Sequence, residues 1–127
     1  MNRPQRILIV SDEAVSGSVR DALEQGGFEV TLAPDFQTAY GELLKSSFML
    51  VIVALADGID GVELIRCVRA TPKLTGILIL FVTEWGAGTA TVALPEGADA
   101  YEPRPLETNR VLASVERLLS RQAVVIK

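Results

Sequence analysis

Three stretches of the sequence are apolar at every position: 7-ILIV-10, 49-MLVIVA-54 and 77-ILILFV-82. A strand that faces water on one side alternates apolar and polar residues, whereas a strand covered on both faces reads as a continuous apolar run. These runs therefore predict a parallel sheet with helices on each side.

Two further runs begin near Phe28 and Ala98, and each segment between successive runs is long enough for one helix. Five strand–helix units follow, so the predicted fold class is α/β, a five-stranded doubly wound parallel sheet. A length of 127 residues suits one domain and is too short for two. We expect the domain over residues 1–121, with residues 122–127 as a C-terminal tail or the start of a linker.

Apolar residues at helical spacing predict four amphipathic helices. The first ends at Gly26-Gly27, and the second begins after Asp35, an expected N-cap. The helix after the third strand should turn Glu63, Arg66 and Arg69 outward. Between positions 85 and 97, Gly, Pro and β-branched residues predict a fourth helix that is short or mobile. The residues expected to face the core are Val15, Val19, Ala22, Leu23, Phe36, Ala39, Tyr40, Leu43, Leu44, Leu64, Ile65, Val68, Val111, Val115 and Leu118 or Leu119.

Composition excludes several classes of function. Twelve basic and sixteen acidic residues give a net charge of −4 without a basic stripe, which disfavours direct binding of nucleic acid. The single Cys67 excludes an internal disulfide and is expected to be a packing residue, and the absence of His removes the commonest metal ligand and general base. No apolar run has the length of a signal-peptide core or a membrane span, so we expect a cytoplasmic protein without membrane contact.

The carboxyl ends of the strands are where sheets of this kind bind ligands. No glycine-rich phosphate loop follows the first strand, so a dinucleotide or nucleotide-phosphate site is not expected. The residues delivered to this edge are Ser11, Asp12 and Glu13 after the first strand, residues 53–60 after the third, Thr83, Glu84 and Trp85 after the fourth, and Arg104 and Pro105 after the fifth.

Four segments carry a resemblance in their order and spacing: 7-ILIVSDE-13, 48-FMLVIVALADGIDGVEL-64, 80-LFVTE-84 and 97-GADAYEPRPL-106. Together they resemble the receiver (CheY-like) domain of two-component response regulators over nearly the whole chain. The resemblance implies a flavodoxin-like strand order of 2-1-3-4-5. It also implies a domain that takes a phosphoryl group from a histidine kinase onto an Asp and changes shape at its last helical face.

The resemblance also shows where this sequence departs from the family. The acceptor Asp stands eight residues before the Gly of an Asp-Gly pair, which is Val53 when counted back from Gly61. The two acids after the first strand match Ser11 and Asp12, with Glu13 beside them. The phosphoryl-contacting hydroxyl matches Thr83, the small residue after it matches Glu84, the Lys of a Lys-Pro pair matches Arg104, and the switch aromatic matches Tyr101.

These departures remove the chemistry of phosphoryl transfer. Val53 offers no nucleophilic oxygen, and Mg²⁺ prefers a shell of hard oxygens that normally includes carboxylates. Arg104 is suited to clamp Asp12 or Glu84, since a planar guanidinium pairs with carboxylates. Glu84 and Trp85 are expected to block the pocket, so no metal or other cofactor is predicted. Asp12 and Glu13 have a plainer alternative as caps of the first helix.

The predicted function is that of a pseudo-receiver, a non-enzymatic domain that signals through phosphorylation-independent protein contact. The partner is a histidine kinase, an output domain, another regulator or a second copy, bound at the surface of the fourth helix, fifth strand and fifth helix. Candidate residues on that surface are Tyr101, Arg110, Glu116 and Arg117. Two alternatives remain open: a receiver phosphorylated at a displaced acceptor, Asp57, and a module that binds a small ligand in the space left by the metal.

Overall fold

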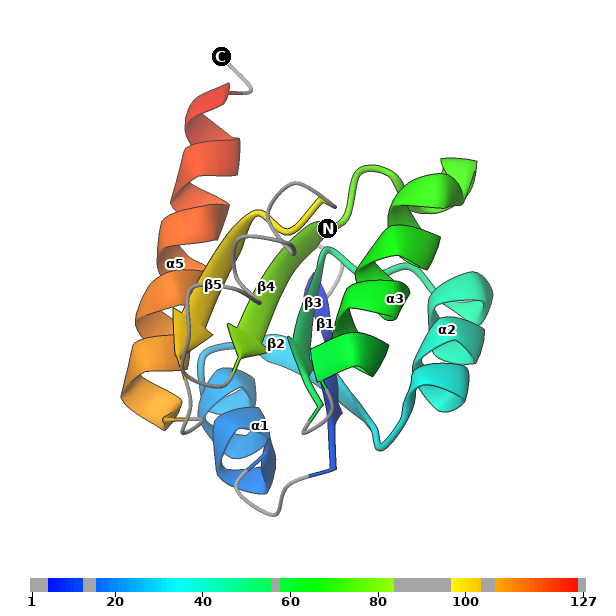
Figure 1. Ribbon diagram of the computed structural model, residues 1–127. Helices are drawn as coiled ribbons and strands as arrows, with labels where there is room; N and C mark the ends of the chain where they lie inside the picture. Colours follow the sequence, from blue (N-terminus) through cyan, green and yellow to red (C-terminus); the bar gives the residue numbers. More distant parts are fainter. Residues whose placement is uncertain (1–4, 13–15, 56–57, 84–96, 104–106, 126–127) are drawn as a thin grey trace.

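The structure, a computed structural model, describes residues 5–12, 16–55, 58–83, 97–103 and 107–125 (Figure 1). The elements in chain order are β1 (Gln5–Ser11), α1 (Ser16–Gln25), β2 (Phe28–Ala33), α2 (Phe36–Lys45), β3 (Leu50–Ala54), α3 (Gly58–Ala70), the 3-10 turn η1 (Pro72–Leu74), β4 (Leu78–Thr83), β5 (Ala100–Pro103) and α5 (Thr108–Val125).

All five strands form one parallel sheet in the order β2-β1-β3-β4-β5, which confirms the predicted fold class. One row of paired residues crosses the whole sheet near the carboxyl ends of the strands. It runs through Ala33, Val10, Val53, Phe81 and Tyr101. The matched acceptor position and the matched switch aromatic therefore lie in the same row, with only Phe81 between them.

Helices cover both faces of the sheet, as the continuous apolar runs predict. Figure 1 shows α1 and α5 against one face and α2 and α3 against the other. Each face has its own buried cluster, one with residues of α2 and α3 and one with residues of α1 and α5. Every residue of β3 is buried, because both faces of this central strand are covered.

The helix boundaries follow local signals. Asp35 caps α2 as predicted, since its Oδ1 accepts the backbone amide of Thr38 at 2.8 Å. This hydrogen bond stabilises the carboxylate and holds the pKa of Asp35 below its usual value. After α1 the chain reverses through Gly27, whose φ of 98° is left-handed and suits glycine.

Most predicted core residues are buried, and two helical residues differ from the prediction. Leu44 is 41% exposed, because it follows the buried Leu43 and successive residues point about 100° apart around a helix. The prediction that Arg69 points outward is wrong, because its side chain is only 22% exposed and is hydrogen-bonded. It stands four residues after the buried Ile65, so its stem begins on the covered side of α3.

The last helix continues to Val125, into the segment expected to be a tail or the start of a linker. Its predicted core residues Val111, Val115 and Leu118 are buried. Within the described ranges, no helix combines the length and hydropathy needed to cross a membrane. The predicted fourth helix, nearly all of which falls within residues 84–96, lies outside the described residues, as does Val15.

Candidate functional site

The switch point of the sheet lies between β1 and β3, where the strand order reverses. Ser11 ends β1 in register with Ala54, the last residue of β3. Ser11 is nearly buried, while Asp12, the next residue, is exposed. The structure thus brings the end of the β1 segment next to the matched acceptor strand, as the sequence predicts.

Val53 is wholly buried at the matched acceptor position, with an exposed fraction of 0%. Its neighbours in the sheet are Val10 and Phe81, which are also wholly buried. These residues belong to the cluster beneath α2 and α3. At the position that the resemblance matches to the acceptor, this protein has a methyl-bearing side chain within the core.

The first turns of α3 pack directly on this position through Gly61. A Cβ added to Gly61 would come 2.7 Å from Cε1 of Phe81 and 3.3 Å from Cγ1 of Val53. Real Cβ atoms essentially never approach another atom as closely as 2.7 Å. Glycine at this position therefore allows α3 to lie close against the sheet, and the contact between Gly61, Val53 and Phe81 is close-packed.

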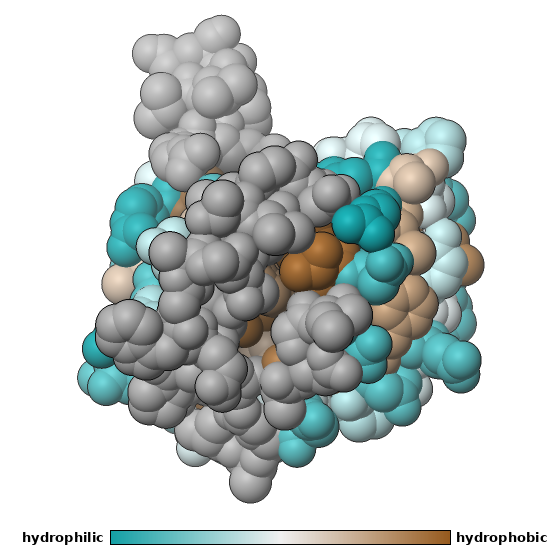
Figure 2. Space-filling view, viewed as in Figure 1, coloured by the Kyte–Doolittle hydropathy of each residue, from teal (hydrophilic) through white to brown (hydrophobic). Residues whose placement is uncertain are grey.

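In the view of Figure 2, hydrophobic surface is visible near the centre and hydrophilic residues lie along much of the rim. The described large hydrophobic residues with substantial exposure include Leu32, Leu44 and Tyr101. Of these three, Tyr101 belongs to the row of paired residues that contains Val53, and it lies at the β5 edge of the sheet.

Several predicted site residues lie outside the described residues: Glu13, Asp57, Glu84, Trp85 and Arg104. Thr83 is described as the last residue of β4, in register with Pro103. Among the described residues, no three carboxylate, thiol or imidazole groups lie together as a metal site. At the three positions where the resemblance implies carboxylates, Ser11, Asp12 and Val53 offer one hydroxyl, one carboxylate and one hydrocarbon side chain. This set does not fit the carboxylate-rich oxygen shell that Mg²⁺ takes in such a site.

The second candidate surface consists of β5 and the exposed side of α5, and we call it the β5–α5 face. Tyr101 is 47% exposed on β5, and Arg110, Glu116 and Arg117 are exposed on α5. Arg110 forms an ion pair with Glu107 at 3.6 Å. These four residues were predicted to lie on one surface, and each is exposed.

A polar contact that was not predicted from the sequence joins the two elements of this face. Ser114 is buried on the inner side of α5, and its hydroxyl donates a hydrogen bond to the carboxylate of Glu102 on β5. The sequence did contain a sign of this contact. Ser114 stands three residues after Val111 and directly before Val115, where helical spacing predicts a buried side chain. A buried hydroxyl needs a partner, so this contact holds α5 against β5.

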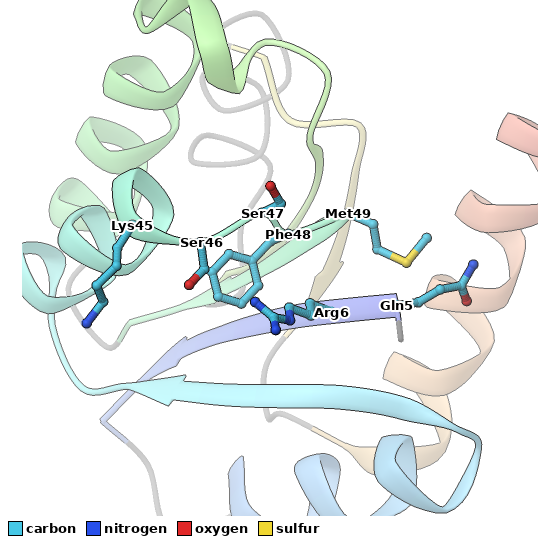
Figure 3. Close-up of a pocket in the computed structure, with 7 residues that line it drawn as sticks. All are labelled: Gln5, Arg6, Lys45, Ser46, Ser47, Phe48 and Met49. Atoms are coloured by element: carbon cyan, nitrogen blue, oxygen red, sulfur yellow. The ribbon is translucent and has the colours of Figure 1, made fainter. Parts of the chain in front are cut away.

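A cavity of about 590 Å³ opens at the opposite edge of the sheet, where α2 ends and β1 and β3 begin (Figure 3). In Figure 3, Lys45 points to one side of it and Met49 and Gln5 to the other, so the polar groups do not converge on one point. Arg6 is paired with Glu29 at 2.7 Å, and Lys45 with Glu42 at 3.3 Å. This cavity is remote from the carboxyl ends of the strands. The small-ligand alternative expects its ligand at those carboxyl ends, in the space left by the metal.

Comparison with solved structures defines the class of fold. A response regulator receiver domain protein (CheY-like) from Methanospirillum hungatei superposes with a TM-score of 0.83 at 28% identity, covering 95% of this chain and 98% of that one. A putative response regulator from Chloroflexus aurantiacus gives 0.83 at 27% identity, covering 93% and 99%. The fold is that of the receiver (CheY-like) domain.

Sequence relatives agree with this class. The response regulator MprA of Mycolicibacterium vanbaalenii is 34% identical over 121 residues, 93% of this chain and 52% of the relative. The transcriptional regulatory protein TrcR of Mycobacterium tuberculosis is 32% identical over 122 residues, 94% and 47% respectively. The chain is a receiver domain of the response-regulator kind, and it spans about half the length of these curated relatives. No protein-family model matches it.

Proposed function

We propose that this receiver domain is a pseudo-receiver, which signals by protein contact without accepting a phosphoryl group. The observation that carries the proposal is the buried, close-packed Val53 at the matched acceptor position. Phosphoryl transfer requires a nucleophilic oxygen in line with the donor, and cations that neutralise charge on the transferred group. Val53 supplies no oxygen, and Gly61 and Phe81 fill the space beside it.

The proposed working surface is the β5–α5 face. It combines an exposed aromatic side chain, Tyr101, with charges of both signs on α5, a composition that suits a protein partner better than a phosphate backbone. The contact between Ser114 and Glu102 holds the two elements of the face together. The partner is a histidine kinase, an output domain, another regulator or a second copy of this chain, in the cytoplasm, and the domain itself is not an enzyme.

Small phosphodonors provide the direct test. Treatment with acetyl phosphate and Mg²⁺ is expected to leave the intact mass of the protein unchanged, because Val53 has no group to modify. A receiver domain that carries the acceptor Asp, treated in parallel, is the positive control and should gain the mass of one phosphoryl group.

A stoichiometric phosphoryl adduct on this protein would contradict the proposal. The Asp57→Asn variant then decides where the adduct forms. Loss of the adduct in that variant would establish the displaced-acceptor alternative, in which this domain is a phosphorylated receiver.

Metal binding is a second expected difference from a phosphorylatable receiver. We expect Mg²⁺ and Mn²⁺ to bind no tighter than about millimolar, because one matched carboxylate and backbone oxygens make a poor shell for an ion that dehydrates reluctantly. Calorimetric titration measures the affinity, and Trp85 fluorescence offers an independent signal. Saturation at micromolar metal would mean that Glu13, Asp57 or Glu84 completes a site, and a rise in melting temperature with a metabolite would favour the small-ligand alternative.

A further inference from the structure

The guanidinium of Arg69, in the last turn of α3, donates hydrogen bonds to two separate segments of the chain. Its Nε donates to the carbonyl oxygen of Gly97 at 2.9 Å. Its Nη1 donates to the carbonyl oxygens of Thr75 and Ile77 at 3.0 and 2.7 Å. Its Nη2 pairs with Oδ2 of Asp99 at 2.9 Å. One side chain thus ties the end of α3 to the segment before β4 and to the segment before β5.

Asp99 extends this contact to the backbone of β4. The same Oδ2 accepts the amide of Ile79 at 2.7 Å, and the amide of Asp99 donates to the carbonyl of Ile79 at 2.8 Å. These bonds come just before the paired residues Leu80 and Ala100, where the register of β4 with β5 begins. The ion pair between Arg69 and Asp99 therefore lies at the point where β5 joins the sheet.

Gly97 packs against the aliphatic part of the Arg69 side chain. Its φ is 126°, a backbone conformation that other residues rarely adopt. A Cβ added there would come 2.4 Å from Cγ of Arg69. The chain thus returns to the sheet in direct contact with the Arg69 side chain, and both the conformation and the available space require glycine.

The geometry requires an arginine and not simply a positive charge. The four acceptors lie around one guanidinium, which offers five N–H donors in a fixed plane. Lysine carries three donors on a single nitrogen at the end of a flexible stem, and cannot reach the same set of acceptors at once.

The other end of α3 contacts the matched acceptor position through Gly61. A single helix of 13 residues therefore packs on Val53 near its start and holds the beginning of β5 at its end. This connection is made entirely by described residues and does not involve Thr83 or Arg104.

We infer that Arg69 is a positioning residue for the β5–α5 face: from the end of α3 it fixes where β5 begins, and thereby where Tyr101 stands. Tyr101 is the second residue after Asp99 in the sequence, so a shift of Asp99 along β4 moves it directly. The inference rests on the proposed function only for the use of this face as a docking surface. The positioning itself requires neither a partner nor a phosphoryl group.

Amide hydrogen exchange, measured residue by residue by NMR, tests the inference on the purified protein. In Arg69→Met, the amides of Ile79 and Asp99 are expected to exchange about tenfold to a hundredfold faster relative to those of Ile9 and Ile52 in β1 and β3. The amide chemical shifts of Ala100, Tyr101 and Glu102 should move as well. Arg20→Met is the matched control, since Arg20 pairs at 3.1 Å with an exposed carboxylate of Asp21, and it should leave all of these signals unchanged.

Equal acceleration of exchange at all four amides would overturn the inference, because Arg69 would then add only to overall stability. Unchanged exchange at Ile79 and Asp99 would overturn it too. Arg69→Lys keeps the charge and provides the measurement if the Met variant does not fold. We expect it to restore only part of the protection, and full restoration would show that charge alone is sufficient. None of these results depends on whether the protein accepts a phosphoryl group, so the two proposals fail separately.

Discussion

Val53→Asp is expected to lower the free energy of unfolding by about 2–4 kcal/mol and to leave the protein unphosphorylated. The side chain is wholly buried between Val10 and Phe81, and Gly61 closes it from the α3 side. A carboxylate placed there loses its hydration, and the hydrocarbon neighbours offer no compensating hydrogen bond. Chemical denaturation in urea measures the loss, and intact mass after acetyl phosphate treatment measures phosphorylation.

The pH dependence of this variant identifies the cause. Burial raises the folded-state pKa of the introduced carboxyl above its unfolded value of about 3.9. The unfolded state then binds fewer protons between the two pKa values, so the penalty grows as pH rises through that window. We expect a larger loss of stability at pH 8 than at pH 5.5. Val53→Asn, which has the same shape without the charge, should show a loss that does not change with pH.

Restoring phosphorylation should require changes together at all four matched positions where this sequence departs from the family. The combined variant Ser11→Asp, Val53→Asp, Glu84→Ala and Arg104→Lys supplies the acceptor, the second acid, the small residue and the lysine that the resemblance calls for. If Val53→Asp alone is as stable as the parent and takes up a phosphoryl group, the site is intact apart from one residue. The proposal of a pseudo-receiver with a closed pocket would then be wrong.

Phe81→Ala is expected to cost about 3–5 kcal/mol, because it removes a large, wholly buried aromatic side chain and leaves a cavity beside the acceptor position. The ring packs against α3 at Gly61, so the helix loses its support at the same place. Urea denaturation followed by circular dichroism gives the change in free energy of unfolding.

Gly61→Ala tests the same contact from the helix side. It should destabilise by about 1–3 kcal/mol, since the added methyl overlaps the Phe81 ring. Gly41→Ala is the matched control, because Gly41 is also in a helix and nothing beyond its chain neighbours and the nearby helix backbone lies within 4 Å of an added Cβ. Alanine there should raise the free energy of unfolding by about 0.5–1 kcal/mol. In the Phe81→Leu background, Gly61→Ala should cost less, because the shorter side chain leaves room. If Gly61→Ala stabilises the protein as much as Gly41→Ala does, there is free space beside Gly61, and the contact between Gly61, Val53 and Phe81 is not close-packed.

The fold could be predicted closely because its determinants are local in the sequence. Strands covered on both faces are apolar throughout, and β1, β3 and β4 match the three apolar runs to within a few residues. Asp35 caps α2 through a hydrogen bond to Thr38, three residues along the chain. Such short-range contacts leave a readable pattern.

The candidate site was predictable in one respect and not in another. The identity of Val53 comes from counting back from Gly61, and the structure adds that this position is wholly buried. The sequence could not show that Gly61 itself contacts Val53 and Phe81, because Phe81 belongs to a different strand. The effect of a glycine depends on what stands opposite it, which only packing determines.

The sequence by itself determined the layers of the fold and the side chain without oxygen, Val53, at the matched acceptor position. Only the tertiary structure decided the role of Arg69, which was predicted to point toward solvent. Its partners Gly97 and Asp99 stand 28 and 30 residues away in the chain. Helical spacing determines the side of α3 from which the stem starts, but the acceptors that a long, flexible side chain reaches depend on which segments the sheet topology brings beside the helix end.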